Sequence, residues 1–193
     1  MELKMRRYTA LVVSSQPRFN DDTAKLLSLR QRIDMELEGS VSSARRRLSD
    51  RNFDFLIINS PLPDENGIRL AIDHSGSGTM AVLLIIPEKY YGEIFDRVCQ
   101  NGIFTLSKPL SRQSMEQALD WLESANERLK KAKKKTVSLE EKMQEIRIVN
   151  RAKWLLISQQ GMTEEQAHRL IDKTAMDRCM TKRAVAEEIL EKS

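Results

Sequence analysis

Short runs of apolar residues constrain the fold of this chain more than any other feature. Strands are expected at Tyr8–Val13 and at residues 53–59, 81–86 and 103–106. Several of these runs are apolar on both faces, as in a parallel sheet that helices cover on both sides. Helices are expected between the runs, for example at residues 22–29 and 42–50. The first half of the chain therefore predicts an α/β, doubly wound parallel sheet with flavodoxin-like strand order.

The length and composition of the chain exclude several classes of protein. A chain of 193 residues allows one or two domains. The two cysteines are far apart, and together with the two histidines they show no disulfide framework and no metal-ligand spacing. We therefore expect neither a metal nor a cofactor. We also see no signal peptide and no apolar stretch near the roughly 18 residues of a membrane span, so we expect a cytoplasmic protein without a membrane partner.

A long segment without glycine or proline follows the predicted sheet, from Ser111 to Gln160. Its large apolar residues lie on or near a heptad-like stripe: Leu119, Leu122, Leu129, Leu139, Met143 and Ile146. A helix of about 35 to 40 residues needs a partner to bury such a stripe. The pattern predicts a coiled-coil helix that forms a parallel homodimer, and the alternative is a broken helix that folds back on its own domain.

Basic residues are concentrated within this segment. The cluster consists of Arg128, Lys130, Lys131, Lys133, Lys134 and Lys135. Like charges at helical spacing repel one another, so the cluster is a reasonable place for a hinge. The net charge of +4 and the pI of about 9.1 are only mild arguments for a polyanionic partner.

The last part of the chain predicts three short amphipathic helices. Gly161 is suited to end the first helix, because glycine adopts the left-handed conformation that often follows a helix. Thr163 and Gln166 form a capping-box pattern for the second helix. Thr181 is suited to begin the third helix through its hydroxyl. The small and apolar residues between these signals predict a packed all-α domain.

This segment resembles the ANTAR domain over residues 148–190. The resemblance is carried by Arg151-Ala152-Lys153, Gly161-Met162-Thr163-Glu164-Glu165-Gln166-Ala167, Ala175-Met176 and Val185-Ala186-Glu187. ANTAR domains bind nascent RNA hairpins and prevent transcription termination, so the resemblance implies a dimer that holds an RNA with two adjacent hairpins. The expected RNA-binding residues are Arg151, Ala152, Lys153, Arg169, Lys173, Arg178, Lys182 and Arg183. Ala152, Ala175 and Met176 are expected to be packing residues that shape this surface.

The first half resembles a response-regulator receiver (CheY-like) over about residues 6–125. The resemblance is carried by Val12-Val13-Ser14-Ser15-Gln16-Pro17, Asn59-Ser60-Pro61-Leu62-Pro63 with Gly67, residues 81–87, and Leu106-Ser107-Lys108-Pro109. In that family these segments end the strands that surround a phosphoacceptor aspartate.

The chain departs from the receiver pattern at the positions that perform its chemistry. Asn59 replaces the nucleophilic aspartate, and an amide does not form an acylphosphate under ordinary conditions. Ser14 and Ser15 replace the acidic pair that holds Mg²⁺. Ile86 replaces a hydroxyl residue, and only Lys108 is retained. The first half is therefore interpreted as a pseudo-receiver with a degenerate phosphoacceptor pocket, in which Asn59 and Lys108 are structural remnants.

The expected organisation is a pseudo-receiver at residues 1–122, an overlapping coiled-coil connector at 111–149 and a three-helix RNA-binding domain at 148–193. The leading hypothesis is an RNA-binding transcription antiterminator, and the alternative is a protein-binding signalling adaptor without RNA activity. No helix-turn-helix pattern supports a DNA-binding regulator, and no catalytic constellation supports an enzyme. The input would come either from a regulatory protein bound to the pseudo-receiver or from the level of a constitutive dimer.

Overall fold

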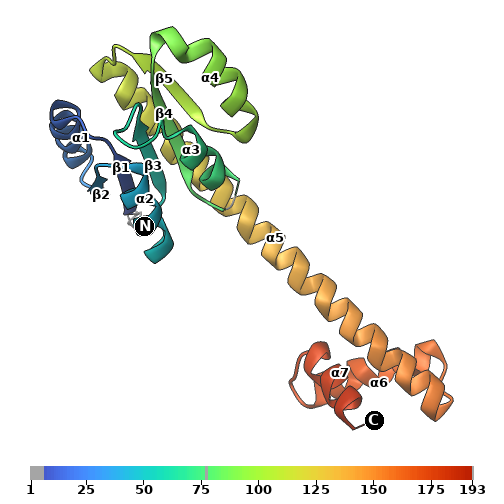
Figure 1. Cartoon of the computed structure of the whole chain (residues 1–193). Helices are drawn as coiled ribbons and strands as arrows, with labels where there is room; N and C mark the ends of the chain where they lie inside the picture. Colours follow the sequence, from blue (N-terminus) through green and yellow to red (C-terminus); the bar gives the residue numbers. More distant parts are fainter. Residues whose placement is uncertain (1–6, 77, 193) are drawn as a thin grey trace. The chain divides into compact units, whose positions relative to one another are not determined.

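A computed structural model of the chain describes residues 7–76 and 78–192 (Figure 1). The chain forms two compact units, which divide between Lys133 and Lys134.

The first unit is built on a five-stranded parallel sheet. Its strands are β1 (Tyr8–Val13), β2 (Ile33–Glu38), β3 (Phe55–Asn59), β4 (Ala81–Pro87) and β5 (Phe104–Lys108). They lie in the order β2-β1-β3-β4-β5, and all four pairings are parallel. This order confirms the predicted flavodoxin-like sheet. Strand β2 was not among the predicted strands, because it lies at an edge of the sheet and alternates apolar with acidic residues instead of forming an apolar run.

Helices cover both faces of the sheet (Figure 1). They are α1 (Pro17–Leu29), α2 (Val41–Asp50), α3 (Ile68–Ser75), α4 (Tyr91–Val98) and α5 (Arg112–Gln160), with short 3-10 turns η1 (Glu88–Tyr90) and η2 (Cys99–Asn101). Apolar residues of α2, α3 and α4 fill the core on one face, and those of α1 and the first turns of α5 fill it on the other. Helix α1 begins five residues before the predicted start, because Pro17 is well suited to the first turn of a helix.

Helix α5 differs from the expected coiled coil in length and in the use of its apolar residues. It runs unbroken for 49 residues, through the whole basic cluster, so the alternative of a broken helix is wrong. Leu119 and Leu122 are completely buried against the sheet. They therefore belong to the core of the first unit and do not continue the stripe of Leu139, Met143 and Ile146, which stays exposed.

A polar anchor fastens α5 to the first unit beyond its last apolar contact. Asn126 is completely buried, and its amide Nδ2 donates to the carbonyl oxygens of Asp54, at 3.1 Å, and Thr79. One turn later, Lys130 donates to the carboxylate of Asp54 and lies 5.6 Å from the centre of the Tyr8 ring. Lys130, a member of the basic cluster, therefore belongs to the structure of the first unit.

The second unit contains the end of α5 with α6 (Glu164–Asp177) and α7 (Lys182–Glu191). Gly161 has a φ of +65° where α5 ends. Thr163 and Gln166 form the predicted capping box, and the Thr181 hydroxyl accepts from the backbone N–H of Ala184 at 3.2 Å. The predicted helix signals are thus confirmed, although the first of the three helices is the last part of α5. A small core of mainly alanine, leucine, isoleucine and valine side chains joins the three.

We predict that Asn126→Ala lowers the free energy of unfolding of the first unit by about 1–3 kcal/mol, because it removes hydrogen bonds to buried carbonyl groups. Urea unfolding followed by Trp121 fluorescence, in a Trp154→Phe background, measures this quantity. Ser124→Ala, an exposed position on the same helix, is the control. Equal stability of the two variants would contradict the anchoring role of Asn126.

Candidate functional site

The carboxyl ends of the central strands bring together most of the degenerate pocket. Ser14 follows β1, Asn59 ends β3, Ile86 lies near the end of β4, and Lys108 ends β5. Because the strands are parallel and adjacent, these positions lie along one edge of the sheet. Ser14, Asn59 and Ile86 are buried, whereas Ser15 is exposed and takes no part in the hydrogen bonds of the pocket.

Hydrogen bonds within this edge are made by uncharged groups and one amine. The Asn59 amide Nδ2 donates to Ser14 Oγ at 3.0 Å and to Gln16 Oε1 at 3.2 Å. Lys108 Nζ donates to the carbonyl oxygen of Ser60 at 2.7 Å, and burial lowers the pKa of this amine. The edge therefore holds an amide where a phosphoacceptor needs a carboxylate.

The same edge lacks the charge that a divalent cation needs. Mg²⁺ is normally held by carboxylates and other oxygen ligands, and Ser14 and Ser15 contribute no charge. Within residues 7–76 and 78–192, no group of three or more potential metal ligands of the His, Cys, Asp and Glu types comes together. Ile86, which replaces the hydroxyl residue of the receiver pattern, is completely buried and offers only a hydrocarbon side chain.

Asp64 holds the loop that follows β3, and the sequence analysis missed it. Its carboxylate accepts from the backbone N–H groups of Val41 and Ser42, both at 2.9 Å, and from Ser42 Oγ at 2.8 Å. These bonds at the N-terminus of α2 hold the pKa of Asp64 well below its usual range. The loop is thereby fastened to α2, a contact across 22 residues or more that no local sequence signal identifies.

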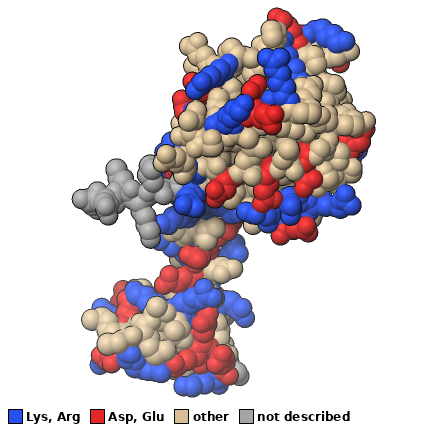
Figure 2. All heavy atoms as spheres, turned by 90° about the vertical axis from the view of Figure 1, so that its left-hand side faces the viewer, with Lys and Arg blue, Asp and Glu red and all other residues tan. Residues whose placement is uncertain are grey.

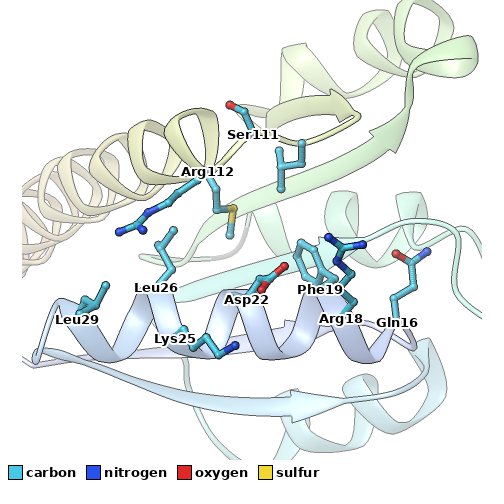
Figure 3. Close-up of a pocket in the computed structure, with 12 residues that line it drawn as sticks. Gln16, Arg18, Phe19, Asp22, Lys25, Leu26, Leu29, Ser111 and Arg112 are labelled. Atoms are coloured by element: carbon cyan, nitrogen blue, oxygen red, sulfur yellow. The ribbon is translucent and has the colours of Figure 1, made fainter.

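Two hollows flank the carboxyl edge. One, of about 500 Å³, lies between α1 and the start of α5 (Figure 3). Its lining combines Phe19, Leu26 and the 68% exposed Leu29 with charged residues of both helices. The other, of about 270 Å³, is lined by residues that include Ser60, Ile86 and Tyr90.

The tyrosine pair in this region has two different environments. Tyr90 lines the smaller hollow and is 47% exposed. Tyr91 stacks on Phe95 with 5.7 Å between ring centres, and its hydroxyl accepts from Thr105 Oγ1 at 3.2 Å. Tyr91 is thus held by packing, and Tyr90 is the more accessible of the two.

Four of the basic residues expected to bind RNA form ion pairs within the second unit. Lys153 pairs with Glu164 at 3.2 Å, Lys182 with Asp172 at 2.8 Å and Arg183 with Glu187 at 2.8 Å. Arg178 binds both carboxylate oxygens of Glu188, at 2.6 and 2.9 Å. These pairs raise the pKa values of Arg178 and Arg183 and lower that of Asp172, in each case chiefly through the shared hydrogen bond.

The other expected contacts divide into free cations and packing residues. Arg151, Arg169 and Lys173 have no acidic partner among the residues that the structure describes. Ala152 is completely buried, so its side chain packs in the core and does not reach a ligand. Ala175 is also buried, but Met176 is 78% exposed, which contradicts its expected packing role.

The charge on this unit is mixed. On the face that Figure 2 shows, basic and acidic side chains intermingle over the smaller lobe, and neither sign forms a continuous patch. A search for a strongly basic surface alone would therefore not single out this unit.

A shallow groove of about 600 Å³ on the second unit was missed by the sequence analysis. It is lined by Arg147, Asn150, Arg151, Trp154, Leu155, Ser158 and Leu190. Of these only Arg151 was predicted as a contact. One sequence signal could have identified the groove. Positions 147, 151, 154 and 158 are spaced by four, three and four residues, which places them together on a face of the helix other than its apolar face.

Comparison with known proteins agrees with this two-part organisation. Residues 138–190 match the ANTAR domain. The chain is 29% identical over 139 residues to the transcriptional regulatory protein PdtaR of Mycobacterium tuberculosis strain H37Rv, an alignment that covers 72% of this chain and 67% of PdtaR.

Solved structures with the fold of the first unit are receiver domains. One is the signal receiver domain of an HD domain-containing protein from Pseudomonas fluorescens Pf-5, with 23% identity, a TM-score of 0.58 and coverage of 69% of this chain and 97% of that one. Another is a CheY-like receiver domain from Methylobacillus flagellatus, with 21% identity, a TM-score of 0.52 and coverage of 60% and 98%. The chain therefore joins a CheY-like receiver fold to an ANTAR domain. None of the helices within residues 7–76 and 78–192 has the length and apolar character needed to cross a membrane.

We predict that Asp64 stabilises the first unit in a pH-dependent manner. Because its pKa is far lower in the folded chain than its ordinary value of 3.8, the stabilisation is fully present above about pH 4 and declines progressively as the pH falls below it. Melting temperatures of the protein and of Asp64→Asn, compared from pH 7 to pH 2.5, should draw closer together in acid. A difference that stays constant over this range would rule out the carboxylate as its cause.

Proposed function

We propose that this protein is a response-regulator-type transcription regulator that acts as an antiterminator, binding tandem hairpins in nascent mRNA as a dimer. The observation that carries this proposal is an ANTAR domain whose surface presents cations that have no acidic partner in the described part of the chain. The proposed organisation is a pseudo-receiver at residues 1–122, a connector at 111–149 and the RNA-binding domain at 148–193.

Charge chemistry favours Arg151, Arg169 and Lys173 as the first phosphate contacts. A cation without an acidic partner can bind a phosphate group without breaking an existing ion pair. The pairs of Arg178, Lys182 and Arg183 lie at the surface, and the acidic partner of Lys153 is exposed. Surface ion pairs contribute little to stability. These four can therefore exchange a carboxylate for a phosphate at small cost, and they remain part of the proposed interface.

The exposed apolar stripe on α5 supports the proposed dimer. Leu139, Met143 and Ile146 recur at spacings of four and three residues and are each more than half exposed. Residues at this spacing form the seam of a parallel coiled coil. A second copy of the same helix would remove these side chains from water and would place two RNA-binding domains in one molecule.

The proposed input to the first unit is a protein partner, not a phosphoryl group. The carboxyl edge has an amide at position 59 and no acidic pair at positions 14 and 15. The hollow between α1 and α5 combines apolar and charged lining residues, as protein interfaces do. The same hollow supports the second candidate function, a signalling adaptor that binds proteins and has no RNA activity.

We expect no phosphoryl transfer to this protein from acetyl phosphate and Mg²⁺, because Asn59 offers no carboxylate nucleophile. Intact-protein mass spectrometry tests this, with a receiver domain that has the complete acidic site as the positive control. Mass gain by one phosphoryl group would contradict the proposal, and peptide mapping would identify the acceptor.

We expect the purified protein to enrich RNAs with two tandem hairpins from a pool with randomised loops, and to bind them better than single-hairpin versions. Light scattering of the complex should give two protein chains for each RNA. Absence of enrichment, or equal and feeble binding of both RNA types, would support the adaptor function.

Lys173→Gln should flatten the dependence of log K on log salt by about one unit, because one phosphate contact is lost. Lys25→Gln, an exposed lysine on α1, should leave the slope unchanged. A slope for Lys173→Gln equal to that of the unsubstituted protein would remove Lys173 from the interface.

A further inference from the structure

We propose that Trp154 is a stacking platform for one unpaired RNA base, whose flanking phosphates are bound by Arg147 and Arg151. This inference rests on the proposed RNA-binding function and adds to it a site and a mode of recognition. It assigns the shallow groove on the second unit to a single-stranded nucleotide of a hairpin loop.

The groove lies on a face of α5 that differs from the core face and borders the exposed stripe. Positions 147, 151, 154 and 158 follow one another at spacings of four, three and four residues, and all four line the groove. The core of the second unit uses other positions of the same helix, among them Ala152 and Leu156. Leu190 of α7 lines the groove as well.

Trp154 is 73% exposed, which is unusual for so large an aromatic side chain in a folded unit. The fold does not depend on it, because the small core around Ala152 and Leu156 is complete without it. The other tryptophan, Trp121, stacks on Phe104 with 6.4 Å between ring centres. The structure describes no such ring contact for Trp154 among residues 7–76 and 78–192, so its faces are available to a ligand.

The neighbouring charges select an anionic occupant. Neither Arg147 nor Arg151 has an acidic partner among the described side chains. An aromatic face stacks on any base, and guanidinium groups bind the phosphates that connect successive bases. Asn150 adds an amide that can both donate and accept at the edge of a base. An apolar peptide would leave both guanidinium groups unused, so charge complementarity favours a nucleotide.

RNA recognition of this type depends on bases that are not paired. Loop bases can leave the helical stack and lie on aromatic side chains, whereas bases inside a duplex cannot. The groove is therefore expected to distinguish the loop of a hairpin from its stem. A second copy of this chain, docked over Trp154 beside the exposed stripe, is the competing occupant that the experiment must separate.

The experiment uses the fact that the chain has two tryptophans. The full chain is prepared as Trp121→Phe, which leaves Trp154 as the reporter, and as Trp154→Phe, which leaves Trp121. Each is titrated with the enriched pool of two-hairpin RNAs and with a fully paired RNA of the same length. We expect hairpin RNA to quench Trp154 fluorescence strongly, and paired RNA to quench neither reporter.

Affinity measurements complete the test. Trp154→Ala should weaken binding of hairpin RNA about 5- to 150-fold, the range for losing one base–aromatic stack, and Trp154→Phe should restore most of it. Circular dichroism and light scattering are expected to show an unchanged fold and dimer mass for both variants. A loss of dimer in Trp154→Ala would overturn the proposal in favour of a protein contact.

Different results would contradict the stacking site and the RNA-binding function. If the unsubstituted protein enriches and binds hairpin RNA but Trp154 shows no quenching and Trp154→Ala binds equally well, the stacking site is wrong and the RNA-binding function stands. If the unsubstituted protein enriches no hairpin RNA, both are overturned.

Discussion

The structure depends on one helix that completes two hydrophobic cores. Helix α5 supplies Leu119 and Leu122 to the core under the sheet and Ala152 and Leu156 to the core of the ANTAR domain. Between these contacts it contains neither glycine nor proline, so nothing in its covalent structure interrupts the i to i−4 hydrogen bonds. The division between the two units therefore falls inside a continuous helix and not in a loop.

The first unit keeps the receiver fold although its carboxyl edge lacks the acidic residues of the receiver pattern. The size and polarity of the residues at those positions explain how this is possible. Asn59 has nearly the shape of aspartate, but it is uncharged and can donate to Ser14 and Gln16 from a completely buried position. A carboxylate there would be costly to bury without a cation. Lys108 similarly satisfies its amine with the Ser60 carbonyl oxygen. Side-chain hydrogen bonds thus connect the ends of β1, β3 and β5 at this edge without a carboxylate.

The features predicted correctly from the sequence are those with a local physical cause. The apolar runs of β3 and β4 predict buried strands because a parallel sheet is covered on both faces, and Thr163 with Gln166 predicts a helix start because both groups act within one turn. Strand β2 was not predicted, because an edge strand needs only one apolar face and therefore forms no continuous apolar run. The contact of Asp64 with α2 and the division of α5 between two cores depend on residues distant in sequence, for which periodicity carries no information. The ion pair of Arg178 with Glu188 was not predicted for the same reason, because it joins residues of two different helices.

The distribution of these ion pairs bears on which residues of the second unit are proposed to contact RNA. In the sequence, all basic residues of this domain look equivalent. Because acidic residues are mixed among them, the net charge does not indicate which of them are available to a ligand. In the folded unit, Lys182 and Arg178 join α6 to α7 through Asp172 and Glu188, so they first serve to hold the helices that present the surface. The cations left without acids, together with the exposed indole of Trp154, are then a smaller and chemically distinct set. A polyanion that bound there would gain charge neutralisation and stacking without first competing with an internal carboxylate, so a nearly balanced net charge does not argue against the proposed RNA partner.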